Sequence, residues 1–371
     1  MKQLILGLAA AATLAGALAT AQPQATAFTL GTFERQGRPL VGVVLRDSVV
    51  IDLAAAHAAV RTPASSIAAP ADMKDLIARY DSGIRARIVE IVRSVEAAGN
   101  NRPAYVHERR ALTTLPPIMY PTTMLNVAVN YREHDLEMAV MRNADPALKG
   151  TFNAAPTQGA APQGTMSAPG YWVRAGDDTR WNPYMFMKAP AAIIADGESI
   201  RLPPERTRVD WECEMGVVIG RQASRVPVAQ AAGYIFGYTI QNDVSDRGGR
   251  GDARYGSDWV IAKNHDTFAP LGPVIVPKEF IADPMKLRVT FTLNGQLLQD
   301  ANTALMIHNV YEQVAYASNI ITLRVGDVIA TGTPAGVGSA RMPPIYYKGG
   351  DTGTCMYEGI GTLTNPVVAS R

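Results

Sequence analysis

The chain of 371 residues has few cysteines, and the two that it has stand far apart. Cys213 and Cys355 are too few for the disulfide framework of a small secreted domain. They also cannot form a cysteine cluster of the kind that holds zinc. Two buried free thiols are the better expectation, although a structural disulfide between them stays open.

The chain also lacks an excess of charge of one sign. It has 35 basic and 33 acidic residues, and no lysine and arginine run forms a tail or stripe. Proteins whose main partner is nucleic acid usually carry such a basic surface, so we expect no nucleic-acid partner. Hydrophobic residues make up 47% and charged residues 18% of the chain, which is a globular composition.

Long hydrophobic runs are missing except near the start. Leu4–Ala19 is apolar, follows Lys2 and leads into Ala19-Thr20-Ala21, which is the order of regions in an export signal. We therefore expect residues 1–21 to be a signal peptide and the mature chain to be exported, to the periplasm, without a stable membrane anchor. The alternative is an anchoring helix, but a bilayer span needs about 20 apolar residues and this run is shorter.

Residues 22–115 are expected to form a small α+β N-terminal domain. Residues 27–53 alternate apolar and polar positions with turns at "RQGRP" and "RDS", which predicts antiparallel strands. Residues 73–98 carry apolar side chains at helical spacing. Residues 102–118, "RPAYVHERRALTTLPPI", have the composition of a linker.

Residues 116–371 are expected to form a second, β-rich domain. Short apolar runs follow one another from Met124 with few crossover helices, which favours mixed or antiparallel sheets over a doubly wound fold. Asn294-Gly295 is a hairpin signal, and residues 306–320 fit one helix. Residues 143–182 show no periodicity, so we expect an insertion there, either near the site entrance or as a flexible excursion.

Two carboxylates interrupt the apolar run "DWECEMGVVI" at residues 210–219. Glu212 and Glu214 are two positions apart, so on a strand they project from one face. Such a pair needs a proton or a cation between its members when it is buried. The other explanation is an edge strand whose polar face meets water. Asp243 ends the next predicted strand and supplies a third carboxylate, and this set of oxygens suits Mg²⁺, Mn²⁺ or Ca²⁺.

Two further features of the sequence lie upstream and downstream of these carboxylates. His134 and Glu137 are three residues apart, so on a helical turn they share a face and the carboxylate can orient the imidazole. This spacing alone is also typical of a surface histidine. Lys263 follows another apolar run and adds a cation.

The order of these motifs resembles the fumarylacetoacetate hydrolase family. The resemblance runs from about Asn126 to Val367 and rests on "NYREHDLE", "FMKAP", "DWECEMGVVIG", "GYTIQNDVSDR", "AKNHDTFAPLGPVIV", "LRVGDVIATGTPAGVG" and "YEGIGTLTNPV". It implies an α+β fold, mainly β, in which a mixed β-roll carries the site and the N-terminal unit is accessory. It also implies a homodimer.

The resemblance assigns roles to the residues that match the family's motifs. It implies that Glu212, Glu214 and Asp243 bind a divalent cation. It implies that His134 is a general base oriented by Glu137, and that Lys263 is the active-site lysine. It places Arg247 and the loop residues Thr331, Gly332 and Thr333 at the substrate, and it includes Lys188 without a clear role.

The implied activity is that of a divalent-metal-dependent hydrolase. It would cleave a carbon–carbon bond in a 2-oxo or β-diketo acid, such as an acylpyruvate, through a metal-bound enolate. Decarboxylation, isomerisation or hydration of a 2-oxo acid would use the same site. A 2-oxo acid binding protein without turnover is the alternative outside enzymes, but a binder has no use for a histidine–glutamate pair.

Overall fold

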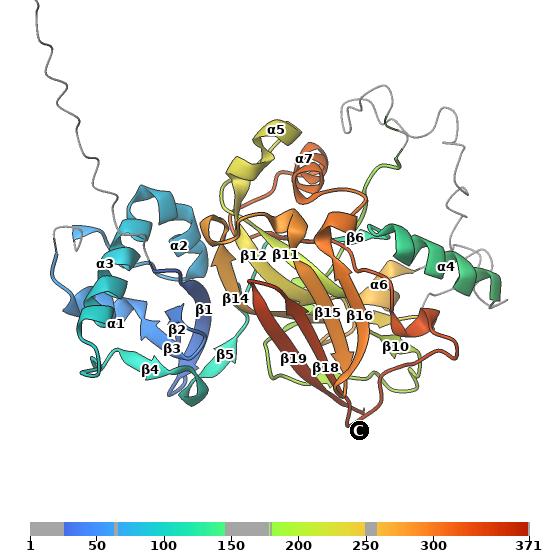
Figure 1. Ribbon diagram of the computed structural model, residues 1–371, viewed down its shortest axis with the longest axis horizontal. Coiled ribbons are helices and arrows are strands. Elements are labelled where there is room, and N and C mark those ends of the chain that lie inside the picture. Colours follow the sequence, from blue (N-terminus) through green and yellow to red (C-terminus); the bar gives the residue numbers. More distant parts are fainter. Residues whose placement is uncertain (1–25, 63–65, 145–177, 179, 249–257, 370–371) are drawn as a thin grey trace, which may run out of the picture.

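The computed structural model describes residues 26–62, 66–144, 178, 180–248 and 258–369. The expected signal peptide and most of the expected insertion lie outside these residues. The described part is mainly β and mixed α+β, as predicted, with a smaller N-terminal lobe beside a larger β-roll (Figure 1). No helix in it combines the length and the apolar character that crossing a bilayer demands.

The largest sheet joins strands of both parts in the order β4-β3-β2-β1-β14-β12-β11-β17-β6-β7, with β5 beside β1 and β8 beside β14. Its strands are β1 (Thr29–Arg35), β2 (Arg38–Leu45), β3 (Val49–Asp52), β4 (Val106–Glu108), β5 (Thr113–Leu115), β6 (Met124–Ala128), β7 (Tyr184–Met187), β8 (Ile193–Ile194), β11 (Cys213–Ile219), β12 (Ile235–Asn242), β14 (Ala269–Pro277) and β17 (Val328–Ala330).

A second sheet has the order β16-β15-β18-β19-β9, and a short pair stands apart from both sheets. The strands of this sheet are β9 (Ile200–Arg201), β15 (Arg288–Leu293), β16 (Gln296–Asn302), β18 (Thr352–Tyr357) and β19 (Gly361–Val368), and the pair is β10 (Val209–Asp210) with β13 (Ser245–Asp246). The α-helices are α1 (Leu53–Ala59), α2 (Met73–Arg79), α3 (Ile84–Ala97), α4 (Arg132–Ala144), α5 (Val228–Ala231), α6 (Trp259–Lys263) and α7 (Val310–Ile320).

The N-terminal lobe begins with the predicted antiparallel strands. β1, β2 and β3 pair in sequence order, and the first turn places Gln36 and Gly37 at φ +53° and +74°. The linker prediction for residues 102–118 is wrong, because β4 and β5 in this segment pair with β3 and β1. Their short apolar runs are too brief to show a period in the sequence.

The helical stretch of this lobe is interrupted in its middle. Residues 73–98 form α2 and α3, and Gly83 between them adopts φ +116°. A Cβ at Gly83 would lie 2.5 Å from Cδ1 of Ile67. Glycine is therefore required at this break, both for its backbone angle and for the space.

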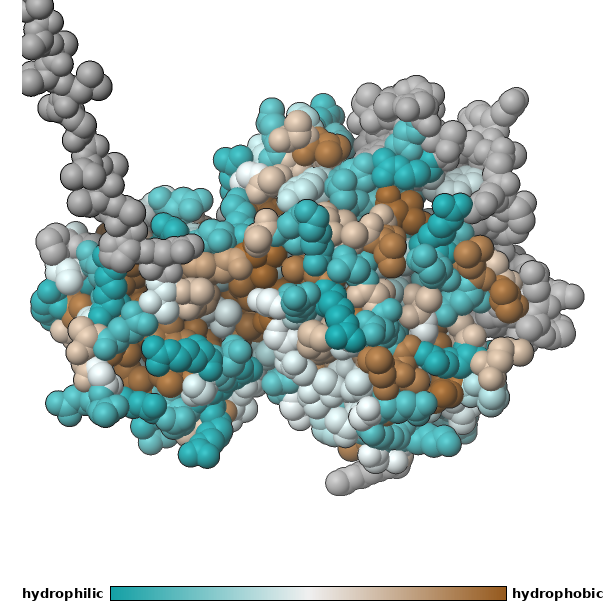
Figure 2. Space-filling model, in the orientation of Figure 1, coloured by the Kyte–Doolittle hydropathy of each residue, from teal (hydrophilic) through white to brown (hydrophobic). Residues whose placement is uncertain are grey.

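The core of the lobe is completed by the β-roll. Leu30, Ile51 and Leu76 of the lobe share one buried cluster with Val218 and Ile275 of the roll. β1 also pairs with β14 through Leu30 and Ile275. On the face in Figure 2, apolar surface lies along the line where the two parts meet. The lobe therefore does not bury its apolar residues alone, and the boundary at residue 115 stays a prediction.

The other face of β11 and β12 packs against the second sheet. Met215 and Val217 share the largest apolar cluster with Val289 and Phe291, and the ring of Trp211 stacks on Phe291 at a centroid distance of 4.9 Å. In this layer, Cys213 and Cys355 are buried and free, which confirms the expectation of two thiols.

Local signals account for two further elements of the roll. Asn294 and Gly295 form the β15–β16 turn at φ +52° and +82°, as predicted. The helix expected at 306–320 begins only at Val310, because Asn309 caps it in a reciprocal capping box with Glu312.

Candidate active site and metal centre

The three predicted carboxylates meet in the interior of the roll. Glu212 directly precedes β11, Glu214 is its second residue, and Asp243 directly follows β12. These strands pair antiparallel with Cys213 opposite Asn242, so the start of one lies beside the end of the other. One carboxylate oxygen from each residue lies within 4.8 Å of the others, and all three residues are buried.

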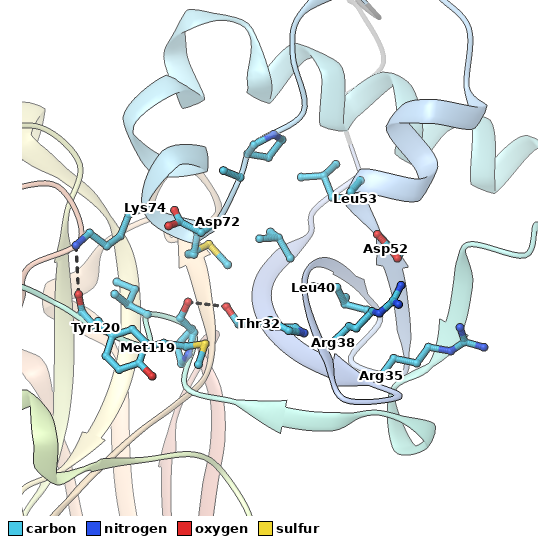
Figure 3. Close-up of a pocket in the computed structure, with 18 of the residues that line it drawn as sticks. Thr32, Arg35, Arg38, Leu40, Asp52, Leu53, Asp72, Lys74, Met119 and Tyr120 are labelled. Atoms are coloured by element: carbon cyan, nitrogen blue, oxygen red, sulfur yellow. Dashed lines mark hydrogen bonds between the residues drawn. The ribbon is translucent and has the colours of Figure 1, made fainter.

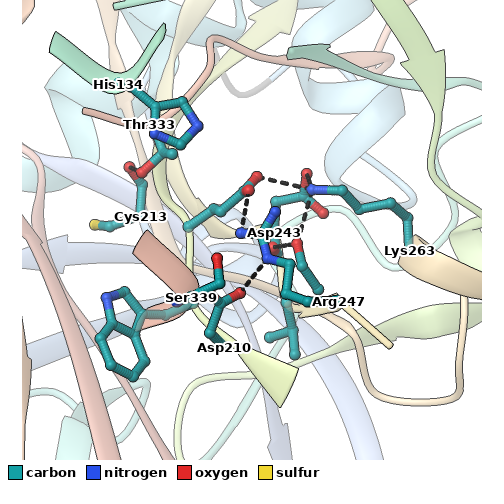
Figure 4. Close-up of polar contacts among 12 residues, drawn as sticks. His134, Asp210, Cys213, Asp243, Arg247, Lys263, Thr333 and Ser339 are labelled. Atoms are coloured by element: carbon teal, nitrogen blue, oxygen red, sulfur yellow. Dashed lines mark hydrogen bonds and ion pairs between the residues drawn. The ribbon is translucent and has the colours of Figure 1, made fainter. Parts of the chain in front are cut away.

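Three cationic side chains contact this triad, and two of them, Lys263 and Arg247, are labelled in Figure 4. The Nζ of Lys263 donates to Oε2 of Glu212 and Oδ2 of Asp243, each at 2.8 Å. The Nη2 of Arg247 donates to Oε1 of Glu212 at 2.5 Å. The Nζ of Lys188 donates to Oδ1 of Asp243 and to the carbonyl of Val244. Two of the three carboxylates are therefore paired on both oxygens.

Glu214 differs from the other two members of the triad. Its Oε2 accepts the backbone N–H of Gly332 at 3.0 Å, and no lysine or arginine bond to it occurs among the described residues. Burial, followed by the negative charges of Asp243 and Glu212, raises its pKa well above the usual range. Burial also acts on Glu212, but Lys263 and Arg247 outweigh it and lower that pKa.

This donor set fits a hard divalent cation. Three carboxylates are gathered on one point, and one of them has no cationic side-chain partner in the described chain. All the ligand atoms are oxygens, which Mg²⁺, Mn²⁺ and Ca²⁺ prefer and softer metals do not. A cation there would favour the ionised form of Glu214, which burial and its neighbours otherwise oppose.

The histidine pair lies on α4, and His134 lines a cavity that Glu212 also lines. Nδ1 of His134 is 2.6 Å from Oε1 of Glu137, and the backbone N–H of Gly336 donates to Oε2 of Glu137 at 2.8 Å. The carboxylate is thus held on one side and holds the ring on the other. Nε2 is the ring nitrogen left for chemistry.

A small cavity lies beside the histidine pair and the carboxylate triad. It encloses about 330 Å³ of empty space, including its open mouth. Its polar wall contains His134, Glu212, Arg247, Lys263 and Thr333, and its apolar wall contains Val127, Ala128, Val129, Met138, Phe186 and Trp259.

The predicted substrate loop is placed at this cavity only in part. Thr333 lines the cavity, and its Oγ1 donates to the carbonyl of Cys213 at 3.1 Å. Gly332 holds Glu214 through its backbone at φ +89°, and a Cβ there would lie 2.7 Å from Cβ of Asn130. Thr331 is buried and donates its N–H to Met215, and it does not line the cavity.

Sequence reasoning missed Asp210 and left Lys188 without a role. Asp210 is fully buried, and its Oδ1 accepts Nε of Arg247 at 2.7 Å while its Oδ2 accepts the N–H of Ser339 at 2.7 Å. Asp210 stands two residues before Glu212, and side chains two apart on a strand share a face. The spacing that predicted the glutamate pair therefore also indicated Asp210. Trp259 and Phe186, which face the cavity, were also missed.

Comparison with known proteins identifies the class to which this roll and site belong. Residues 123–368 match the sequence model of the C-terminal domain of fumarylacetoacetate hydrolase. The match covers more than half of the chain, so the chain belongs to the fumarylacetoacetate hydrolase family.

Two of the similar proteins are named as oxaloacetate tautomerases. A mitochondrial oxaloacetate tautomerase of Bos taurus is 41% identical over 260 residues, which span 70% of this chain and 71% of the bovine one. The rat counterpart is 41% identical over 187 residues, which span 50% of this chain and only 59% of the relative's length.

Solved structures agree on the fold. A 5-carboxymethyl-2-hydroxymuconate delta-isomerase from Mycobacterium smegmatis has a TM-score of 0.61 at 29% identity and covers 92% of this chain and 99% of its own. A fumarylacetoacetate hydrolase from Exiguobacterium antarcticum has a TM-score of 0.64 at 26% identity and covers 92% of this chain and 100% of its own.

Proposed function

We propose that the protein is a divalent-metal-dependent enzyme that interconverts the keto and enol forms of a 2-oxo dicarboxylic acid of the oxaloacetate kind. The observation that carries this proposal is a small cavity lined by His134, Glu212 and Lys263. Glu214 and Asp243 lie beside Glu212 in the carboxylate triad, and Glu137 holds the ring of His134. The names of the 41% identical relatives support the reaction.

The chain's own residues supply the proton transfer. Nε2 of His134 takes a proton from the carbon next to the oxo group, while Glu137 holds the ring and stabilises its charged form. Negative charge then develops on the oxo oxygen, and the ammonium of Lys263 stabilises it. The protonated His134 returns the proton to that oxygen, which completes the enol.

The triad would support this step by holding a divalent cation. Glu212, Glu214 and Asp243 would hold it, and it would supply Lewis acidity that polarises the oxo group and stabilises the developing charge. Arg247 and Lys263 favour entry of an anionic substrate into a cavity that otherwise carries several carboxylates.

Carbon–carbon bond hydrolysis is the second candidate. In it, His134 takes a proton from water, and the water oxygen bonds to the distal carbonyl carbon. The bond between that carbon and the adjacent CH2 carbon then breaks. The attacked carbon leaves as a carboxylic acid, and the other fragment leaves as an enolate that the protonated His134 protonates. The observation that favours it is the rigid hold on the imidazole by Glu137 and Gly336, which suits activation of a water molecule as well.

One pair of assays separates the candidates and tests the metal. Chelator-stripped protein, and the same protein reloaded with Mg²⁺, Mn²⁺ or Ca²⁺, is given oxaloacetate and an acylpyruvate. We expect accelerated keto–enol interconversion of oxaloacetate, monitored by enol absorbance, only after reloading. Full activity of the stripped protein would refute the metal role, and cleavage of the acylpyruvate without interconversion of oxaloacetate would assign the hydrolase.

A further inference from the structure

We propose that a second site, in the N-terminal lobe, binds a small organic anion with an apolar body. The site is the cavity between the β1–β2 hairpin, the start of α2 and residues 117–120 (Figure 3). It encloses about 1660 Å³ of empty space including its open mouth, several times the space at the triad. None of its lining residues belongs to the proposed active site, so the inference does not depend on the proposed function.

Two arginines of the hairpin give the cavity its charge. Arg35 and Arg38 stand directly opposite each other across the Gln36-Gly37 turn. Like charges in such a pair destabilise a hairpin. Within the part of the chain that the structure describes, neither guanidinium forms a hydrogen bond or an ion pair. A bound anion would offset this repulsion and would receive the paired donors that arginine offers to carboxylate, sulfonate or phosphate.

The two acidic residues that line the cavity are N-caps of helices. Oδ1 of Asp52 accepts the N–H of Ala55 and caps α1, and Oδ1 of Asp72 accepts the N–H of Asp75 and caps α2. These bonds keep both carboxylates at their helix termini, where negative charge is stabilising. With Lys74 also in the wall, the lining carries three cations against two acids.

The remaining wall of the cavity contains apolar side chains, several of them buried. Leu53, Met73 and Ile118 are almost fully buried and face the cavity beside Leu40 and Val41.

Two side-chain bonds fix the segment that closes the cavity. The hydroxyl of Thr32 donates to the carbonyl of Pro117 at 2.9 Å, and Nζ of Lys74 donates to the carbonyl of Tyr120 at 3.2 Å (Figure 3). A concave apolar wall with a few convergent polar groups is the usual geometry of a small-molecule site. The charge at the hairpin then selects an anionic head and the walls select an apolar body.

The test uses the full-length protein and the fluorescent probe 8-anilinonaphthalene-1-sulfonate, which joins a sulfonate to an apolar body. We expect one saturable site, and we expect Arg35→Gln and Arg38→Gln each to weaken it about tenfold, the effect of losing one charge-assisted hydrogen bond. The matched control is Arg46→Gln at the next turn of the same sheet, whose side chain is 80% exposed and which should leave affinity unchanged. The uncharged analogue N-phenyl-1-naphthylamine should bind about tenfold more weakly than the sulfonate.

Hydrogen–deuterium exchange on the unmodified protein places the probe independently of the variants. We expect the probe to slow exchange in residues 36–41 and 118–120. Equal affinity in the three arginine variants, or slowed exchange only around Glu212 and Lys263, would overturn the proposal, because the probe would then bind elsewhere.

Discussion

The two faces of strand β11 and of the residue before it differ in the neighbours that they meet. Cys213 and Met215 point into the apolar layer between the two sheets, whereas Glu212 and Glu214, one residue away on either side, point into a cluster of charges. All four residues are buried. Burial alone therefore does not determine whether a residue here is polar or apolar. The side chains that it contacts on its face of the strand do.

The two faces are also stabilised in different ways. Burying an apolar side chain contributes about 1.5–3 kcal/mol whatever apolar neighbour it meets. Buried charges, in contrast, stabilise only as a set, and removal of one member leaves its partners uncompensated. The following substitutions test this difference, beginning with the largest effect.

On the charged face, Asp243→Leu should lower stability and abolish activity together. It leaves the buried ammonium groups of Lys188 and Lys263 without Asp243, at a cost of about 3–5 kcal/mol. Chemical denaturation and the enol assay measure the two effects. Asp266→Leu, on the exposed Asp266, is the control and should change stability by less than about 0.5 kcal/mol. Equal stability of the two variants would mean that the cluster does not act as a set.

His134→Ala should separate activity from stability. Turnover should fall by about 10²- to 10⁴-fold, the usual contribution of a general base, while the fold should tolerate the change. Steady-state kinetics and thermal unfolding give the two numbers. Glu133→Ala changes the exposed neighbour on the same helix and should retain turnover. If turnover is unchanged in His134→Ala, the base has been assigned to the wrong residue.

On the apolar face, Met215→Ala should show the opposite separation. The cavity that it leaves between the sheets should lower the free energy of unfolding by about 2–4 kcal/mol. The folded protein should keep most of its turnover, because Met215 does not face the site. Met342→Ala, at a side chain that is 77% exposed, provides the comparison. Loss of turnover without loss of stability would contradict the independence of the two faces.

The partly exposed ion pair of Arg180 and Glu312 gives the smallest effect. Burial alone would raise the pKa of Glu312, but hydrogen bonds from His308 and Arg180 outweigh it and lower the pKa to about 2. Stability from this carboxylate is thus present above its unfolded pKa of about 4.3 and is lost as the pH falls toward 2.

Because solvent screens the pair, we expect it to contribute no more than about 1 kcal/mol. The difference in unfolding free energy between the unmodified protein and Glu312→Gln should shrink between pH 6 and pH 2.5. A difference that is the same at both values would show that the ion pair adds nothing.

Local patterns in the sequence carried much of the information about the site. The i, i+2 spacing of Glu212 and Glu214 and the i, i+3 spacing of His134 and Glu137 are periodicities of a strand and a helix, and the structure has both pairs facing one way. Asn294-Gly295 forms its turn for a similar reason, because the backbone angles are a property of those two residues.

What the sequence could not show depends on contacts between distant segments. Lys188 and Asp210 meet Asp243 and Arg247 only after the strands assemble, so no spacing predicts these bonds. The pairing of β1 with β14 is likewise a tertiary contact, and it joins two parts that composition alone separates. The helical spacing of residues 73–98 did not predict the break at Gly83, because part of its need for glycine comes from Ile67, a residue outside that pattern.

The loop at residues 332–336 serves both halves of the proposed chemistry through main-chain groups, since the N–H of Gly332 contacts Glu214 and that of Gly336 contacts Glu137. Insertion or deletion of a single residue in this loop would displace Glu137, the partner of the general base, and Glu214, the proposed cation ligand, at the same time. Anyone who wishes to transplant this chemistry to another scaffold should therefore carry the loop across whole, as a spacer of defined length.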